Sequence, residues 1–234
     1  MAVKKQDIRE SPAMPGVYIF RKGDVPLYIG KAVDLKKRLV SYFRGRVNDK
    51  IARLRAEADH VEWYPAASEI DALICESSLI KMHQPKFNVL MRDDKNYFYV
   101  ALTHAPFPRI VITHQPDASA ARHIGPFVSG APLRDTLRLL RRTFPYCTCK
   151  SAHEKKCLNA EIGRCPGYCC LKNVTPRPED SAAYAARLAA IASILSGKRR
   201  KLAAEIKRRM RAASAIGEYE RAIEFRDQLK EYNQ

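Results

Sequence analysis

Two apolar runs on either side of a tight turn place a β-hairpin near the start of this chain. Residues 16–20 read GVYIF and residues 26–30 read PLYIG, with a Gly-Asp pair at positions 23 and 24 between them. Val, Ile, Tyr and Phe favour extended backbone, and a Gly-Asp pair between two such runs is typical of a hairpin turn. We therefore expect an antiparallel hairpin within a small sheet.

Helical and extended patterns alternate after the hairpin. Asp34 is the expected N-cap of the next helix, and Ser68 with Asp71 has the spacing of a capping box. In the helix after Ser68, apolar residues at helical spacing predict one face packed on the sheet, with Glu76 beside that face. Helices are predicted over residues 35–43, 49–58, 68–84 and 131–144, and strands over 60–66, 96–103, 108–114 and 121–127.

The composition changes twice along the chain. A mixed strand and helix region ends near Phe144, a stretch rich in Cys, Gly and Pro follows, and the tail from Pro178 reads as helices broken at Gly197 and Gly217. The predicted class is α+β: a small mixed or antiparallel sheet with flanking helices, then a cysteine-rich metal-binding segment and an all-α helical hairpin. The predicted segments are 12–92, 93–146, 147–172, 178–196 and 198–233.

The formal charge of +17, from 42 Lys and Arg against 25 Asp and Glu, indicates a polyanionic partner. Nucleic acid is favoured over a membrane surface. No apolar run approaches the roughly 20 residues that span a bilayer, and the first ten residues lack the apolar centre of a secretory signal. We therefore expect a cytoplasmic protein without a membrane partner.

Alternation along the two strands of the hairpin places both of their tyrosines on one face. Val17 and Ile19 point to one side of the first strand and Tyr18 to the other. Tyr28 opposes the aliphatic residues of the second strand, with Gly30 beside it where a large group can approach. Three phenols and two cations are expected near one end of the sheet: Tyr18, Tyr28, Tyr42, Lys31 and Arg38.

These groups suit hydrolysis of a phosphodiester. A phenol has an ordinary pKa near ~10 and acts as a base only where cations favour the phenolate. Arg38 can neutralise charge that develops on phosphate oxygens. Glu76 can hold Mg²⁺ or Mn²⁺, because such ions often take one or two carboxylates plus phosphate oxygens. The competing interpretation makes Tyr18 and Tyr28 amphipathic sheet residues and Glu76 a solvated helix flank.

Six of the seven cysteines lie between positions 147 and 170. In a reducing compartment such a cluster indicates a metal before it indicates disulfides. Four thiolates here can enclose one tetrahedral ion or ligate an iron–sulfur cluster, and free buried thiols are the alternative. Cys147 can replace Cys149 in this set, and Cys170 can replace Cys169. The four expected ligands are Cys149, Cys157, Cys165 and Cys169.

The tail is predicted to form two basic amphipathic helices with Gly217 between them. An apolar seam this small is not stable alone, so the hairpin is expected to dock on a partner or on a second copy. A solvated helix pair that contacts DNA phosphates is the alternative. The apolar positions expected at the contact are Leu202, Ile206, Met210, Tyr219, Ala222, Ile223, Phe225 and Leu229.

The ordered set of GVY, YIGK, Arg38, Glu76 and the Asn88 of PKFN resembles the GIY-YIG nuclease superfamily. More narrowly, PGVYIF, LYIGKA and SEIDALICESSLIKMHQPKFNVLMRDDKNYFYV are similar to the UvrC family of bacterial nucleotide excision repair, and this likeness runs from about Met14 to the C-terminus. Val17 stands where the superfamily motif has Ile, and ESSLIK replaces the commoner ENNLIK. Neither departure removes a chemical group that the mechanism needs.

The resemblance implies roles for these side chains. Glu76 would bind the metal, Arg38 would stabilise the transition state, and Tyr18 is the first choice for helping to deprotonate water. The catalytic set would be Tyr18, Tyr28, Arg38 and Glu76, with support from Gly30, Lys31, Tyr42 and Asn88.

The resemblance also bears on the cysteines and the tail. The family's cysteine region is associated with a four-iron, four-sulfur cluster, which is expected here in preference to zinc, and its cysteine pattern carries over to the four expected ligands. The tail segment EYERAIEFRDQL resembles the UVR motif, through which UvrC meets the helicase subunit UvrB. Damaged DNA and UvrB are therefore the expected partners.

Full UvrC proteins continue into a ribonuclease H-like nuclease, whereas this sequence ends at Gln234. The expectation is therefore an incision 3′ to a lesion in a UvrB–DNA complex, without the 5′-incision domain. An independent structure-specific GIY-YIG nuclease and a non-catalytic adaptor that binds UvrB are the alternatives. The catalytic set argues against the adaptor, and the tail argues against independence.

Overall fold

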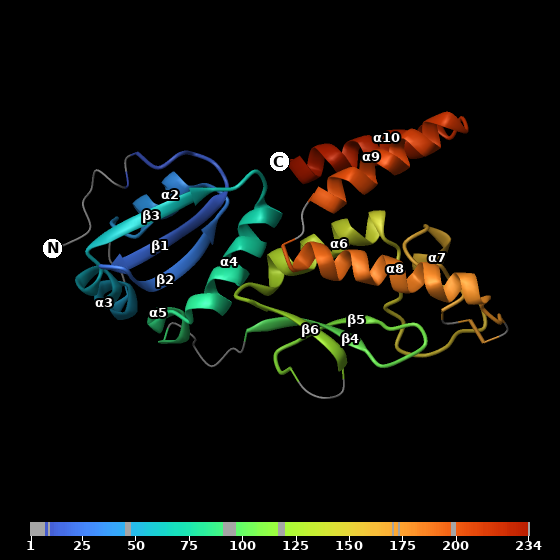
Figure 1. The fold of residues 1–234 in the computed structure, drawn as a ribbon, viewed down its shortest axis with the longest axis horizontal. Coiled ribbons are helices and arrows are strands. Elements are labelled where there is room, and N and C mark those ends of the chain that lie inside the picture. Colours follow the sequence, from blue (N-terminus) through green and yellow to red (C-terminus); the bar gives the residue numbers. More distant parts are fainter. Residues whose placement is uncertain are drawn as a thin grey trace. The chain divides into compact units, whose positions relative to one another are not determined.

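The computed structural model describes residue 8 and residues 10–44, 48–90, 97–116, 120–169, 171–172, 174–197 and 200–233. The chain divides into two compact units, the first ending at Asn96 and the second beginning at Tyr97. Each unit has its own three-stranded sheet (Figure 1). The predicted α+β class is confirmed, and the finer segment boundaries stay predictions.

The first unit is built on the predicted hairpin. β1 (Gly16–Lys22) and β2 (Val25–Ala32) pair antiparallel, and β3 (His60–Pro65) pairs antiparallel with the other side of β1. The turn between β1 and β2 has Gly23 at φ +54°, a conformation that glycine adopts at little cost. The hairpin and the strand predicted over residues 60–66 are confirmed.

Two helices of the first unit begin at the predicted caps. Asp34 Oδ1 accepts the Lys37 N–H at 2.8 Å, and Ser68 Oγ accepts the Asp71 N–H at 3.2 Å. A short helix at Lys86 is not predicted, because five residues are too few to show a helical period. The helices are α2 (Leu35–Ser41), α3 (Asp49–Glu57), α4 (Glu69–His83) and α5 (Lys86–Leu90).

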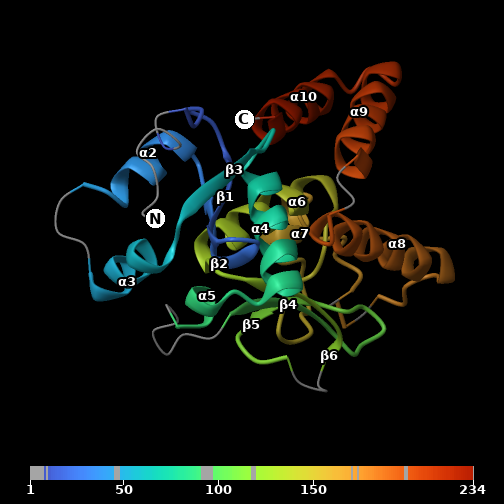
Figure 2. The ribbon, with the colours of Figure 1, turned by 60° about the vertical axis from the view of Figure 1, so that its left-hand side comes forward.

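Helices cover the sheet of the first unit on both sides. α2 and α3 lie on one side, and α4 lies on the other (Figure 2). Tyr18 and Phe20 are fully buried among apolar side chains that include those of α2 and α3. Val17 and Ile19, on the opposite face of β1, are each 1% exposed. Both faces of the central strand are therefore core.

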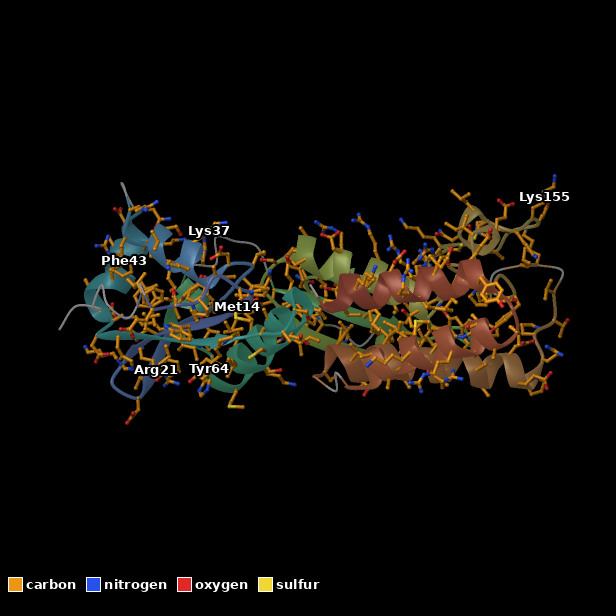
Figure 3. The ribbon with its side chains drawn as sticks, turned by 90° about the horizontal axis from the view of Figure 1, so that it is seen from above. Met14, Arg21, Lys37, Phe43, Tyr64 and Lys155 are labelled. Carbon is orange, nitrogen blue, oxygen red and sulfur yellow. The ribbon has the colours of Figure 1, made fainter. Side chains whose placement is uncertain are left out.

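Charged side chains cover the outer edge of this sheet at β3. Arg21 and Tyr64 lie on the same side of the first unit (Figure 3). The Glu62 carboxylate accepts a hydrogen bond from Arg21 Nε at 2.8 Å and another from Tyr64 Oη at 2.9 Å. Charges along an exposed edge oppose pairing with another chain.

The second unit has an antiparallel sheet in the order β5-β4-β6, from β4 (Phe98–Thr103), β5 (Ile110–Thr113) and β6 (Ala120–Phe127). β4 and β5 lie within predicted segments, and β6 begins one residue before the strand predicted over 121–127. α6 (Gly130–Thr143) follows and buries Leu133, Leu137 and Leu140. The cysteine-rich segment after α6 has one helical turn, α7 (Leu158–Glu161).

Three longer helices follow: α8 (Pro178–Leu195), α9 (Arg200–Ala215) and α10 (Tyr219–Asn233). The predicted breaks at Gly197 and Gly217 are confirmed, with φ +95° and +79°. Arg209 of α9 donates to the Thr143 carbonyl at the end of α6 and lies over the Phe144 ring, 5.4 Å from its centroid. Within the described residues, no helix is both long and apolar enough to cross a membrane.

Candidate active site

The hydroxyl groups of two tyrosines meet beside the β1–β2 hairpin. Tyr18, in the middle of β1, and Tyr42, directly after α2, place their Oη atoms 2.8 Å apart. Arg38 of α2 donates from Nε to Tyr18 Oη at 3.1 Å and from Nη2 to Tyr42 Oη at 3.5 Å. One guanidinium thus holds both phenols. Its Nη1 has no hydrogen-bond partner among the described residues.

Tyr28 of β2 completes a group of three tyrosine rings. Its ring centroid lies 6.1 Å from that of Tyr18 and 6.4 Å from that of Tyr42. Gly30 is the cross-strand partner of Tyr18, and a Cβ at this glycine would lie 2.5 Å from Tyr18 Oη. The large group expected to approach Gly30 is therefore the Tyr18 ring itself. The structure brings the three predicted phenols together.

Burial opposes ionisation of these phenols. Burial raises the pKa of Tyr18 well above its ordinary value, Tyr28 and Tyr42 raise it further, and the Arg38 charge acts in the opposite direction. The pKa of Tyr28 is also raised, first by burial and then by Tyr42 and Glu76. A phenolate at this site therefore needs more positive charge than Arg38 alone supplies.

Glu76 of α4 turns its carboxylate toward the end of β2. It is 4% exposed, so its interpretation as a solvated helix flank is wrong. Oε1 accepts the Lys31 N–H at 2.8 Å, whereas Oε2 is buried without a hydrogen-bond partner in the described part of the chain. Burial raises the pKa of Glu76 to about 7, against the lowering effects of Lys31 and Arg38.

The second oxygen of Glu76 fits a hard cation. A buried carboxylate oxygen without a partner costs free energy unless a cation or water meets it. Carboxylate oxygen is also the ligand type that Mg²⁺ and Mn²⁺ prefer. The Glu76 charge raises the pKa of Tyr28, and Arg38 lowers the pKa of Glu76. Carboxylate, phenols and guanidinium therefore act on one another within a single site.

Asn88 of α5 fixes the strand that carries Tyr28. Its Oδ1 accepts the Ile29 N–H at 2.8 Å, and its Nδ2 donates to the Ile29 carbonyl at 2.7 Å. The amide is therefore bound to the strand backbone between Tyr28 and Gly30. Sequence reasoning reached Asn88 only through the family resemblance, because this contact joins residues that are far apart in the chain.

Three sulfur atoms meet in the second unit. The Sγ atoms of Cys147, Cys165 and Cys169 lie within 4.8 Å of one another, with Cys165 and Cys169 3.4 Å apart. A tetrahedral ion with sulfur ligands at about 2.3 Å holds neighbouring sulfurs about 3.8 Å apart, so this donor set fits a metal. Cys149 and Cys157 place their sulfurs 3.6 Å apart.

The group of sulfurs within 4.8 Å of one another thus holds only two of the four expected cysteine ligands. Cys165 and Cys169 lie with Cys147, the residue considered as a substitute for Cys149. Cys147 is 2% exposed, and its N–H donates to Tyr184 Oη at 3.1 Å. The backbone at this cysteine is therefore fixed inside the second unit. Cys170 lies outside the described residues.

Two family models match the chain in sequence order. Residues 14–89 match the UvrC-like GIY-YIG domain, and residues 97–194 match the middle domain of the UvrC/Cho excinuclease. The chain belongs to the UvrC family. The UvrABC system protein C of Desulforudis audaxviator is 41% identical over 235 residues, which cover 98% of this chain and 37% of that relative. The protein of the same name from Thermus thermophilus is 34% identical over 232 residues, covering 97% and 38%.

The chain thus spans somewhat more than a third of the length of these UvrC relatives. A solved structure of the GIY-YIG N-terminal endonuclease domain of UvrC from Thermotoga maritima, bound to magnesium, is 41% identical. The match covers 36% of this chain and 98% of that domain, with a TM-score of 0.34. By the family model, residues 14–89 are a UvrC-like GIY-YIG domain.

In this UvrC-family chain the α9–α10 hairpin follows the two matched segments. A groove of about 520 Å³ lies between its helices, and four of the predicted partner-binding residues line it: Met210, Tyr219, Ala222 and Ile223. Ile206, also expected at the contact, is fully buried within the chain and is therefore not open to a partner. Phe225 and Leu229 are half-buried and do not line this groove, and the side chain of Leu202 lies outside the described residues.

Sequence reasoning missed the side chains that hold the cysteine segment of this UvrC-family chain, above all Arg141. In the sequence Arg141 belongs to a segment that predicts a basic amphipathic helix. One signal was present, because Arg141 follows Leu133 and Leu137 at four-residue spacing and so lies on the helix face that carries these buried leucines.

Proposed function

We propose that residues 14–89 hydrolyse a phosphodiester bond of DNA with Mg²⁺ or Mn²⁺ as cofactor. The observation that carries this proposal is the buried, unpartnered Oε2 of Glu76 in the same site as Arg38 and the phenols. The magnesium-bound domain of Thermotoga maritima UvrC supports the choice of cation. The net charge of +17 supports a polyanionic substrate.

The side chains divide the work as follows. A cation held by Glu76 would supply Lewis acidity and a bound water of lowered pKa. Arg38, anchored on two phenols, can offer Nη1 to a phosphate oxygen and stabilise the charge that develops there. We propose that Tyr18 accepts the proton of the attacking water, because its oxygen already accepts a hydrogen bond from Arg38. Tyr42 completes the contact that holds Tyr18 in place.

The test of this proposal is Glu76→Gln, which keeps the size of the side chain and removes the charged ligand. With UvrB present, the nicking rate on a lesion-containing duplex with Mg²⁺ should fall by about 10²- to 10³-fold or more, the range for loss of one electrostatic group in an active site. Glu69→Gln is the matched control, since this residue is an exposed glutamate on the same helix. An undiminished rate in Glu76→Gln contradicts the assignment.

We propose further that the chain acts in excision repair and cuts 3′ to a lesion in a complex with UvrB. The relatives are named UvrABC system protein C, and the exposed apolar groove of the α9–α10 hairpin is suited to a protein partner. Nicking should then require UvrB and fall to the UvrB-free level in Ile223→Asp. Cutting without UvrB favours an independent nuclease, and binding without cutting favours an adaptor.

For the cysteines we propose a four-iron, four-sulfur cluster, with zinc as the alternative. The group of thiols around Cys165 and Cys169 supports a metal, and the choice of an iron–sulfur cluster rests on the resemblance to the UvrC cysteine region. Iron, sulfide and zinc analysis of protein prepared without oxygen tests this, and one equivalent of zinc without iron contradicts the cluster. Cys147→Ser compared with Cys149→Ser tests which of the two is the ligand.

A further inference from the structure

One arginine of α6 connects two parts of the cysteine segment. The Nε–H of Arg141 is shared between the carbonyl of Tyr146, at 3.1 Å, and the carbonyl of Arg164, at 2.9 Å. These carbonyls belong to the residues directly before Cys147 and Cys165. Both cysteines are in the group of three sulfurs that lie within 4.8 Å of one another. A single N–H therefore fixes the backbone beside two of the three clustered thiols.

The same guanidinium makes further contacts with this segment. Nη2 of Arg141 donates to Thr148 Oγ1 at 3.1 Å, and Cζ lies 5.0 Å from the centroid of the Tyr146 ring. The Tyr146 hydroxyl donates to the Leu137 carbonyl at 3.2 Å, so this ring is itself attached to α6. The planar guanidinium is thus held in one orientation.

The segment is tied on a second side by Tyr184 of α8. Tyr184 Oη accepts the Cys147 N–H at 3.1 Å and donates to the Pro108 carbonyl at 2.8 Å. Arg109, the next residue after Pro108, donates from Nη1 to the Cys149 carbonyl at 3.1 Å. The backbone around Cys147 is therefore held between α6 and α8 by side chains from outside the cysteine segment.

We propose that Arg141 is a positioning residue of the cysteine metal site, which sets Cys147 against Cys165 through the carbonyls that precede them. This inference rests on the proposal that the cysteines bind a metal. Groups that hydrogen-bond around the ligands of a metal orient those ligands, and their loss typically costs about 10- to 100-fold in metal affinity.

The test uses the full chain as wild type, Arg141→Gln, Arg141→Lys and Arg138→Gln. Arg138 is the matched control, because it lies on the same helix with its side chain 76% exposed and paired to Asp135. Each protein is loaded with iron and sulfide, or with zinc, without oxygen. Metal per chain, the rate of metal release to a chelator and the thiolate-to-metal absorption bands are measured. Circular dichroism reports whether the helices are intact.

Arg141→Gln should release the metal about 10- to 100-fold faster than wild type at equal helix content. Its thiolate-to-metal bands should shift, which a role in folding alone does not predict. Arg141→Lys keeps the charge but not the Nε donor, so it should recover only part of the retention. Arg138→Gln should match wild type. If Arg141→Gln loses helix, Arg141→Lys takes its place and should release metal faster than wild type, because the Nε donor to the two carbonyls is lost.

Release at the wild-type rate with unshifted bands, in Arg141→Gln or in Arg141→Lys when that variant takes its place, overturns the positioning role. Full recovery in Arg141→Lys also overturns it, because charge alone then accounts for the effect. A wild-type chain that takes up no metal overturns it together with the metal-site proposal. That result is distinguishable because it appears before any substitution. The nuclease proposal is tested separately, by the nicking rate of Glu76→Gln.

Discussion

Gly30 has no side chain, and this leaves the space that the Tyr18 ring occupies. The Tyr18 Oη lies only 2.5 Å from the position that a Cβ of residue 30 would take. From this place it contacts Arg38 and Tyr42. The alternation of residues along the strand predicts that Tyr18 and Gly30 face the same side. It does not predict that the ring lies across the glycine, because this depends on the α2 side chains that cover it.

Gly30→Ala should therefore act on stability and rate together. Overpacking at this contact should cost about 1–3 kcal/mol of unfolding free energy, and displacement of Tyr18 by about 1 Å should lower the nicking rate about 10²-fold. Denaturant unfolding and single-turnover nicking measure the two effects. Gly23→Ala is the comparison, since its φ of +54° makes alanine strained while no atom lies within 4 Å of its Cβ. It should lose stability and keep the rate, and a normal rate in Gly30→Ala would contradict the contact.

The raised pKa of Glu76 predicts a pH dependence of metal binding. Its pKa of about 7 means that below this pH most of the carboxyl groups carry a proton, which the cation must displace. Mg²⁺ affinity should therefore fall as the pH drops below about 7, approaching tenfold per pH unit, and level off above it. Calorimetric titration between about pH 5.5 and 8.5 measures this. A flat affinity over that range would show that Glu76 is already ionised or is not a ligand.

A short helix positions the candidate active site as much as the longer helices do. The helices after Asp34 and Ser68 follow from their caps and apolar spacing, and both were predicted. The five-residue α5 was not, yet its Asn88 holds the backbone of Ile29 in β2 by two hydrogen bonds. Position along the chain does not reveal such a contact. It joins an element of one turn to a strand almost sixty residues earlier.

Asn88→Ala should destabilise the first unit through β2. Ile29 is fully buried, so its N–H and carbonyl lose their partner in a place that water does not reach. A cost of about 2–4 kcal/mol is expected for two such groups. Mg²⁺ affinity should also fall, because β2 carries the Lys31 N–H that holds Glu76.

Denaturant unfolding and metal titration measure these two effects of Asn88→Ala. Asn48→Ala makes the same exchange at the exposed N-cap of α3, where it should cost about 1 kcal/mol and leave Mg²⁺ affinity unchanged. Equal effects of the two substitutions on stability and on affinity would show that the Asn88 contact does not hold the site.

At the scale of the molecule, the nuclease site and the cysteine cluster belong to different units. The phenols, Arg38 and Glu76 all lie before Asn96, and the clustered cysteines lie after Tyr97. Because a ligand stabilises the state that binds it, each metal should act mainly on the unit that holds it.

Hydrogen exchange with and without Mg²⁺ tests this separation. At a concentration of 100 times its Kd, Mg²⁺ should raise protection in the first unit by up to about 2.7 kcal/mol. Protection in β4 to β6 should stay unchanged, and Glu76→Gln should abolish the effect. An equal increase in both units would show that Mg²⁺ binds outside the proposed site or that the two units unfold together.

The hairpin, the capped helices, the helix breaks at Gly197 and Gly217 and the likeness to UvrC can all be predicted from the amino-acid order, because they depend on local backbone preferences and ordered motifs. Which side chains meet is seen only in the folded chain. The Tyr18 and Tyr42 hydroxyls, the unpartnered oxygen of Glu76 and the place of Cys147 beside Cys165 depend on burial and on contacts between distant residues. Burial raises the pKa of Glu76 and leaves its Oε2 to a cation, and no local pattern reports burial of this kind.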